Sequence, residues 1–205
     1  MKTLLFSLLL SFILLNSCTD DSSELISTDE QITKESTSPN WVKLPGDKGK
    51  DFSTDSKYSA QKIINGKEGG VINLNVKIER PKHKFGNFEI KTTVTVEKHS
   101  FPDDEERLFT VTLNPNDAFL KISPSPNTLN KHIKVDWEIQ GFDVSDIISN
   151  KFNFYYIGYL NEMVETSKEE LTVDYRNHKI KVKNAIINSV TTGDTPDGAW
   201  YGFIL

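Results

Sequence analysis

Apolar and polar residues alternate along most of the chain from residue 70 onward, with the period of two that is typical of β-strands. In the first such segment the apolar positions are Ile72, Leu74, Val76 and Ile78, and the residues between them are polar. The alternation recurs at 88–96, 109–113, 120–122, 135–139, 171–175 and 180–186. Successive side chains of a strand point to opposite faces of a sheet, so each segment presents one apolar face.

Short stretches rich in glycine, proline, asparagine and aspartate separate these segments and are typical of turns. They lie at 65–66, 69–70, 102–104, 114–117, 124–127 and 195–198, and Asn177-His178 is short enough for a two-residue hairpin. The pattern gives about eight or nine strands and no long amphipathic helix. We therefore predict an all-β fold, an antiparallel β-sandwich of immunoglobulin-like or jelly-roll-like type.

Two segments depart from simple alternation. Residues 152–160 read FNFYYIGYL and are apolar on both faces, which predicts a central strand that is covered on both sides. The chain ends with WYGFIL at 200–205, which also resembles a strand. We expect this last segment to be paired inside a sheet, because an exposed apolar strand would favour aggregation.

The N-terminus has the features of a removable signal at residues 1–17. Lys2 precedes an apolar segment at 4–15, whose twelve residues are too few to span a bilayer, since a spanning helix needs roughly 20. The sequence Leu15-Asn16-Ser17-Cys18 follows and resembles the lipobox of bacterial lipoproteins. The resemblance implies cleavage before Cys18 and attachment of acyl chains to it, which would anchor the protein to a membrane.

Residues 18–40 are rich in Ser and Thr and contain six acidic residues against one lysine, which is typical of a disordered tether. The pair Asp20-Asp21 resembles the surface-export signal of lipoproteins from Bacteroidetes-type bacteria. It implies a lipid-anchored outer-membrane protein exposed at the cell surface. The alternative is a solvated spacer, with the protein facing the periplasm.

Charge and length narrow the possibilities for the remaining part, residues 41–205. The whole chain has a net charge of −5, but 41–205 contains 22 basic and 23 acidic residues and no basic stripe, so we expect no nucleic-acid partner. The 188 residues after the signal are enough for a single domain. A structural disulfide within the chain is excluded because Cys18 is its only cysteine.

The segment Ile63 to Ile72 reads IINGKEGGVI, and its pattern resembles the start of the β-sandwich domain of ankyrins and netrin receptors. Where that family has an apolar-Pro-x-Gly-Ala turn, this chain has Ile78-Glu79-Arg80-Pro81-Lys82, without the Gly-Ala. The resemblance implies a non-enzymatic sandwich that contacts other proteins.

No motif in the sequence predicts catalysis, a cofactor or a metal site. The four histidines, at 83, 99, 132 and 178, lack a second ligand at metal-binding spacing. The acidic clusters 103–106 and 194–198 are expected to be solvated turns, with weak Ca²⁺ binding as the alternative. Asp136 and Glu138 share a strand face, which Glu170 or Asp174 could approach as a glycosidase pair would require, but a solvated face is the ordinary interpretation.

Exposed aromatic residues would indicate a sugar-binding platform, and Trp41 and Trp200 are the candidates we expect to be exposed. The sequence therefore favours a non-enzymatic, lipid-anchored envelope protein whose sandwich binds or scaffolds another macromolecule, an unknown protein or glycan. The alternatives are a glycan-binding accessory protein of a polysaccharide-uptake system and a hydrolase on a jelly-roll scaffold.

Protease shaving of intact cells tests the predicted location, with Cys18→Ala as the unanchored control. We expect residues 41–205 to be lost from intact cells, because the acidic pair after Cys18 directs the protein outward. Protection that persists until the outer membrane is broken would contradict the export signal and place the domain in the periplasm.

Overall fold

The computed structural model describes residues 39–45, 56–124, 129–148, 151–157, 163–187 and 199–205. The chain divides into two units, Met1–Glu35 and Ser36–Leu205, and all described residues belong to the second unit. Cys18, the acidic tether up to residue 38 and the acidic cluster at 194–198 therefore lie outside the described residues.

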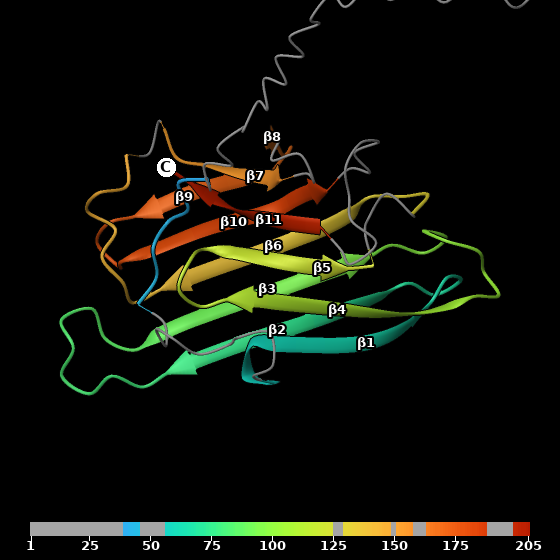
Figure 1. Cartoon of the computed structure of the whole chain (residues 1–205), viewed down its shortest axis with the longest axis horizontal. Helices are drawn as coiled ribbons and strands as arrows, with labels where there is room; N and C mark the ends of the chain where they lie inside the picture. Colours follow the sequence, from blue (N-terminus) through green and yellow to red (C-terminus); the bar gives the residue numbers. More distant parts are fainter. Residues whose placement is uncertain (1–38, 46–55, 125–128, 149–150, 158–162, 188–198) are drawn as a thin grey trace, which may run out of the picture. The chain divides into compact units, whose positions relative to one another are not determined.

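The described part is all-β, as the alternation predicts, with one short 3-10 turn, η1 (Ser56–Tyr58), before the first strand (Figure 1). Its strands are β1 (Ser59–Asn65), β2 (Gly70–Ile78), β3 (Phe88–Val96), β4 (Glu106–Asn114), β5 (Phe119–Ser123), β6 (Ile133–Gln140), β7 (Asn153–Ile157), β8 (Met163–Glu165), β9 (Glu170–Asp174), β10 (Lys179–Ile187) and β11 (Ala199–Ile204). These eleven strands exceed the expected eight or nine, in part because a segment as short as β8 shows too few residues for alternation to be recognised.

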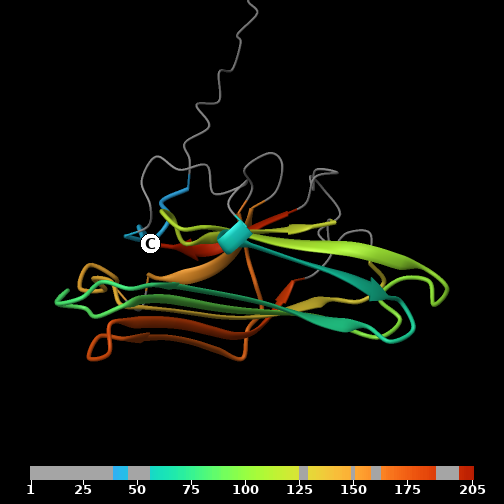
Figure 2. The ribbon, with the colours of Figure 1, turned by 90° about the horizontal axis from the view of Figure 1, so that it is seen from below.

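The strands form two antiparallel sheets that face each other as a β-sandwich, and Figure 2 shows the two layers from the side. The six-stranded sheet has the order β1-β4-β5-β11-β7-β8, and the five-stranded sheet has the order β2-β3-β6-β10-β9. Consecutive strands such as β1 and β2 lie in different sheets, so the chain crosses between the layers. The predicted sandwich is confirmed.

The core between the sheets is formed by the apolar side chains that alternate with polar ones along the strands. Ile72, Leu74 and Val76 of β2 are buried against the second sheet, as their alternation predicts. At the centre Trp137 of β6 stacks on Phe203 of β11, with ring centroids 4.8 Å apart. Large aromatic rings that bury their full surface contribute most to such a core.

The C-terminal segment lies near the middle of the six-stranded sheet. β11 pairs with β5 on one side and with β7 on the other, so the expectation of a paired C-terminal strand is confirmed. β7 has Phe154 and Tyr156 in the core, and on its other face Tyr155 packs against a second cluster of buried residues. Apolar contacts thus lie on both faces of β7, although Tyr155 is only partly buried and β7 lies beside the edge strand β8 and not at the centre of the sheet; residues 158–162 lie outside the described residues.

The turn between β9 and β10 differs from the predicted two-residue hairpin. Asp174 pairs with Lys179, so the loop has four residues, 175–178. Both oxygens of the Asp174 carboxylate accept hydrogen bonds from Asn177, one from its backbone N–H at 3.0 Å and one from its side chain at 2.6 Å. This capping by Asp174 stabilises a wider turn, which ends on His178 with a positive φ of 50°.

A strap formed by residues 39–45 pairs through isolated antiparallel bridges with the end of β11 and with the residues just before β5. The Val42 N–H donates to the Phe203 carbonyl at 3.0 Å, and the Ala118 N–H donates to the Val42 carbonyl at 2.7 Å. Trp41 packs on Phe119, with ring centroids 4.9 Å apart, and on Ile204. The strap therefore joins the start of β5 to the end of β11.

Trp41 is only 6% exposed, so the prediction that it is available to a ligand is wrong. Its ring lies over Gly202 of β11, where any Cβ atom would overlap the indole ring and the Ala118 carbonyl. A glycine inside a strand commonly marks such a close approach. For Trp200 the structure describes the backbone within β11, and its side chain lies outside the described part.

The fit between Trp41 and Gly202 can be measured by a double-mutant cycle. Trp41→Ala should lower the free energy of unfolding by about 3–5 kcal/mol, which is typical for removal of a buried aromatic side chain. Gly202→Ala should cost less in the Trp41→Ala background than in the wild type, because one of the overlaps has been removed. Urea denaturation measures both effects.

Ile63→Ala serves as the control for that cycle, because Ile63 is 63% exposed and its truncation should change stability by less than about 1 kcal/mol. Additive effects of the Trp41 and Gly202 substitutions would show that the two residues do not interact.

Candidate functional site

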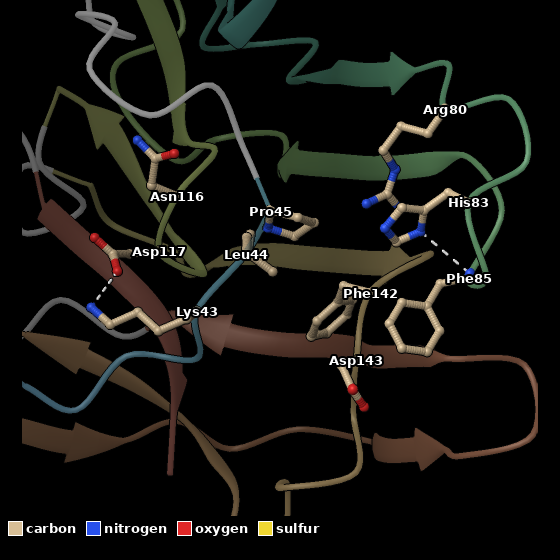
Figure 3. A pocket seen from close by; sticks show the side chains of 10 residues that line it. All are labelled: Lys43, Leu44, Pro45, Arg80, His83, Phe85, Asn116, Asp117, Phe142 and Asp143. Atoms are coloured by element: carbon tan, nitrogen blue, oxygen red, sulfur yellow. Dashed lines mark hydrogen bonds and ion pairs between the residues drawn. The ribbon is translucent and has the colours of Figure 1, made fainter.

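A pocket of about 530 Å³ lies at one end of the sandwich, where the β2–β3, β4–β5 and β6–β7 connections meet the strap (Figure 3). This volume lies within the range of known small-molecule sites. The lining residues are Lys43, Leu44, Pro45, Arg80, His83, Phe85, Asn116, Asp117, Phe142 and Asp143. Figure 3 shows Arg80 on one side and Asp117 with Lys43 on the other, with Leu44 and Pro45 between them.

The β4–β5 connection forms one wall and is fixed by its own side chains. Asn114 Oδ1 accepts the backbone N–H groups of Asn116 at 2.8 Å and of Asp117 at 3.1 Å, which closes the turn that the Asn-Pro-Asn-Asp sequence predicts. The strap is held against this wall, since the Leu44 N–H donates to the Asn116 carbonyl at 2.7 Å. The buried Oδ1 atom of Asn116 has no hydrogen-bond partner among the described residues.

Arg80 forms the opposite wall at the end of β2. Its backbone N–H donates to Asn87 Oδ1 at 3.1 Å, and its Nη2 donates to the Gly141 carbonyl. The loop at Gly141 can approach because this residue has a φ of +85° and no Cβ, which would overlap the Asn87 carbonyl. The Arg80 guanidinium also lies over the Phe88 ring, at 5.6 Å from its centroid.

The charge of Arg80 has no counter-ion in the described part of the chain, where no carboxylate forms an ion pair with it. Its Nε atom is buried without a hydrogen-bond partner. Partial burial removes water from the charged group and lowers the pKa of the guanidinium, although an arginine remains protonated at neutral pH. Among the described residues, Arg80 is therefore a positive charge of the pocket without a carboxylate partner.

The two carboxylates of the pocket are each offset by a lysine. Lys43 Nζ lies 2.5 Å from Asp117, and Lys84 Nζ lies 3.6 Å from Asp143. Hydrogen bonds from the hydroxyl and the backbone N–H of Ser145 lower the pKa of Asp143 further than Lys84 alone would. Both carboxylates thus have a lysine partner, whereas Arg80 has no carboxylate partner among the described residues.

The remaining lining is largely apolar. Leu44 and Phe142 are buried side chains of the core that also reach the pocket. The Phe85 ring contacts His178, with ring centroids 4.5 Å apart, and Lys84 Nζ lies 4.2 Å from its centroid. The aromatic residue at the rim is therefore already engaged by two neighbours.

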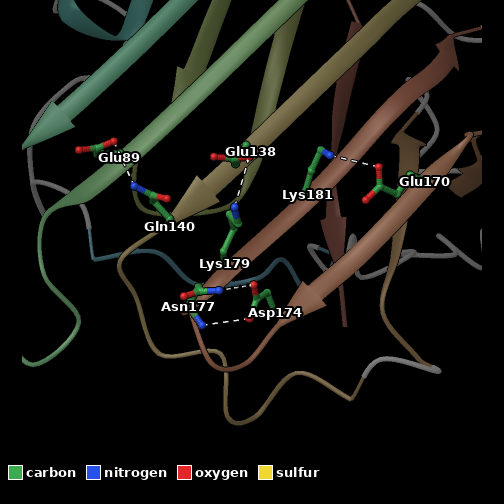
Figure 4. Close-up of polar contacts among 8 residues, drawn as sticks. All are labelled: Glu89, Glu138, Gln140, Glu170, Asp174, Asn177, Lys179 and Lys181. Atoms are coloured by element: carbon green, nitrogen blue, oxygen red, sulfur yellow. Dashed lines mark hydrogen bonds and ion pairs between the residues drawn. The ribbon is translucent and has the colours of Figure 1, made fainter.

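The outer face of the five-stranded sheet contains the acids that the sequence singled out as a possible catalytic pair (Figure 4). Glu138 pairs with Lys179 at 3.6 Å and Glu170 pairs with Lys181 at 3.1 Å. Asp136 Oδ1 accepts the Asn184 N–H at 2.7 Å, at the bulge where β10 shifts its register. These carboxylates hold neighbouring strands together.

The acidic cluster 103–106 lies at the turn before β4, and two of its members have basic partners. His99 Nδ1 lies 2.6 Å from Asp103, and Arg107 lies 2.8 Å from Glu105. Within the described residues no three His, Cys, Asp or Glu side chains are grouped to hold a metal ion. The described part of the chain also contains no helix long and apolar enough to cross a membrane.

Comparisons with protein-family models, curated protein sequences and solved structures found no match to this chain.

The sequence predicted the turn at 114–117 and described His83 as a histidine without a second metal ligand, but it did not bring these residues together with Arg80 in one site. Arg80 was noticed only as a departure from a family turn, and Gly141 lies 61 residues further along the chain. The available signals are weak. A glycine directly after a strand and an arginine beside a proline are both compatible with ordinary turns.

The pH dependence of stability should reflect the turn at Asp174. Hydrogen bonds from the Asn177 side chain and then from its backbone N–H lower the pKa of Asp174 in the folded protein. The unfolded chain therefore binds the proton more tightly, so this stabilisation is present above the unfolded pKa of about 3.9 and is lost as the pH falls through the folded value. The difference in urea midpoint between wild type and Asp174→Asn should shrink as the pH is lowered from 7 to 3.

Asp104→Asn removes an exposed charge from another turn and is the control for the pH experiment. A difference between wild type and Asp174→Asn that stays constant over the pH range would contradict the assigned cause of the shift.

Proposed function

We propose that this protein is a lipid-anchored lipoprotein of a bacterial outer membrane, and that its β-sandwich is a non-catalytic binding module that takes its ligand in the end pocket. The observation that carries the binding role is the pocket itself, with its apolar floor and one uncompensated cation at Arg80. A concave, mostly apolar site with a few polar groups is the usual form of a ligand site.

The anchor is supported by the sequence around Cys18. Cys18 is the only cysteine of the chain, and it follows the apolar segment at the position that a lipobox requires. Several acyl chains on one residue give stable membrane attachment, whereas a single chain gives only marginal binding. The acidic pair Asp20-Asp21 supports exposure at the cell surface, and the periplasmic face is the alternative.

A binding role is favoured over chemistry by the state of the pocket carboxylates. The hydrolase alternative requires a pair of carboxylates, one of which keeps its proton near neutral pH so that it can act as the general acid. Asp117 and Asp143 are instead each paired with a lysine, Lys43 and Lys84, and hydrogen bonds from Ser145 lower the pKa of Asp143. The pocket thus contains charges suited to recognition.

The alternative of a glycan-binding accessory protein has less support. It depends on an exposed aromatic platform, and Trp41 of the strap is buried against Phe119 and Ile204. In the pocket Phe85 is engaged by His178 and Lys84. Glycan binding is therefore one outcome that a fluorescent reporter at the pocket can distinguish.

Metabolic labelling with radioactive palmitate tests the anchor. The wild-type chain should incorporate label and remain in the membrane fraction, and Cys18→Ala should do neither, because the thiol is the attachment point. Label that persists in Cys18→Ala would contradict the assignment.

A fluorescent reporter tests the binding module. His83→Cys places a thiol at the pocket rim of the full-length chain, where it is the only free cysteine once Cys18 is acylated. An environment-sensitive dye on this thiol should change its emission when envelope extracts are added. The same dye on Lys77→Cys, on the exposed face of β2, should not respond.

Extracts separated into glycans and smaller molecules would show which class binds. No response at His83→Cys with any fraction, or chemical conversion of the bound compound, would contradict a non-catalytic binding pocket.

A further inference from the structure

We propose that the end pocket binds a carboxylate carried on an apolar body, with Arg80 as the receptor for the carboxylate. This inference rests on the proposed binding function and specifies its ligand. The geometry that points to it is a half-buried guanidinium without a counter-ion, set beside the apolar floor made by Leu44, Pro45 and Phe142.

The hydrogen-bonding capacity of Arg80 is mostly unused. A guanidinium has five N–H donors, and among the described residues only Nη2 has an acceptor, the Gly141 carbonyl. Nη1 and the second hydrogen of Nη2 form the end of the planar group that a carboxylate can accept from with both oxygens. Charge-assisted bonds of this kind are stronger where water is partly excluded, as at this partly buried site.

Arg80 is also held in place before any ligand arrives. Its backbone is fixed by Asn87 Oδ1, its Nη2 by the Gly141 carbonyl, and its guanidinium lies over Phe88. A long side chain that is already ordered loses less conformational entropy on binding. Ordering of Arg80 thus favours the use of its free donors for a ligand.

The neighbouring charges leave Arg80 as the group that recognises a carboxylate. Lys43 offsets Asp117 and Lys84 offsets Asp143, so these carboxylates do not cancel the charge of Arg80. A carboxylate on the ligand would therefore meet a guanidinium that has no counter-ion among the described residues.

The apolar surface between Arg80 and Asp117 determines what the rest of the ligand should be. Leu44, Pro45 and Phe142 offer apolar surface and no hydrogen-bonding side chain. Phe85 is engaged by His178 and Lys84, so it offers a poor stacking surface for a sugar ring. An aliphatic body fits this surface better than a polyhydroxylated one.

Titration of the full-length protein in detergent micelles tests the proposal with three carboxylates: hexanoate, N-acetylleucine and glucuronate. Each has a neutral amide as its matched control. Calorimetry should give hexanoate or N-acetylleucine an affinity about tenfold or more above that of its amide, because hydrogen bonds to a charged group are worth this much. Glucuronate should bind more weakly than either.

The two apolar acids also distinguish the possible sources of the ligand. Stronger binding of hexanoate would indicate a free aliphatic acid, and stronger binding of N-acetylleucine would indicate the C-terminal residue of a peptide. Stronger binding of glucuronate than of both would overturn the apolar body of the ligand.

Arg80→Gln should reduce the preference for the acid over the amide to less than about twofold, since its charge is gone. Arg176→Gln, which removes an exposed arginine from the β9–β10 turn, should leave the preference unchanged. The wild-type protein gives an independent readout. The Nε–H resonance of Arg80, assigned by its loss in Arg80→Lys, should shift in ¹⁵N NMR on addition of the acid and not of the amide.

An acid and an amide that bind equally, or an unshifted Arg80 resonance, would overturn the inference and show that Arg80 only fastens Gly141. A response of the His83→Cys reporter to neutral compounds alone would then leave the binding function intact. Failure of that reporter with every fraction would instead remove the proposed function itself.

Discussion

The close packing of β11 is the constraint on which the rest of this sandwich depends. β11 lies between β5 and β7, so the six-stranded sheet is continuous only when the last residues of the chain are in place. On its inner face Phe203 stacks on Trp137 of the opposite sheet. On its outer face Gly202 leaves room for Trp41, and the strap is thereby joined to the same strand. One strand thus connects both sheets, the core and the N-terminal end of the domain.

The end pocket follows from this arrangement. The strap brings Lys43, Leu44 and Pro45 to the end of the sandwich where three strand connections meet. At Gly141 the absence of a Cβ lets the β6–β7 connection approach the Asn87 carbonyl in the β2–β3 connection. The Gly141 carbonyl accepts a hydrogen bond from Arg80 and so holds its side chain in place. Two glycines in unrelated parts of the chain therefore allow the close approaches that shape the site, and each would be strained or blocked by any larger residue.

The charged side chains serve different purposes at the two places where they gather. On the outer face of the five-stranded sheet, Glu138 and Glu170 lie beside lysines of β10, and such cross-strand pairs add modestly to sheet stability. At the end pocket the carboxylates are also paired with lysines, but Arg80 is left without a partner. Paired acids on the sheet face thus support neighbouring strands, whereas the unpaired Arg80 distinguishes the pocket as a candidate binding site.

The sequence by itself determined the fold class and most strand positions, because alternation is a property of the local backbone. It placed Ile186 on the apolar face with Ile180 and Val182, but the bulge after Val182 shifts this alternation, so Ala185 and Ile187 are buried instead. It also predicted correctly that the C-terminal segment is paired. The pairing of strands, the burial of Trp41 and the pocket were decided by the tertiary structure. Trp41 and Gly202 are 161 residues apart, and Arg80 and Gly141 are 61 apart. Local patterns do not encode which distant segments meet, since contact across such distances depends on the packing of the whole sandwich.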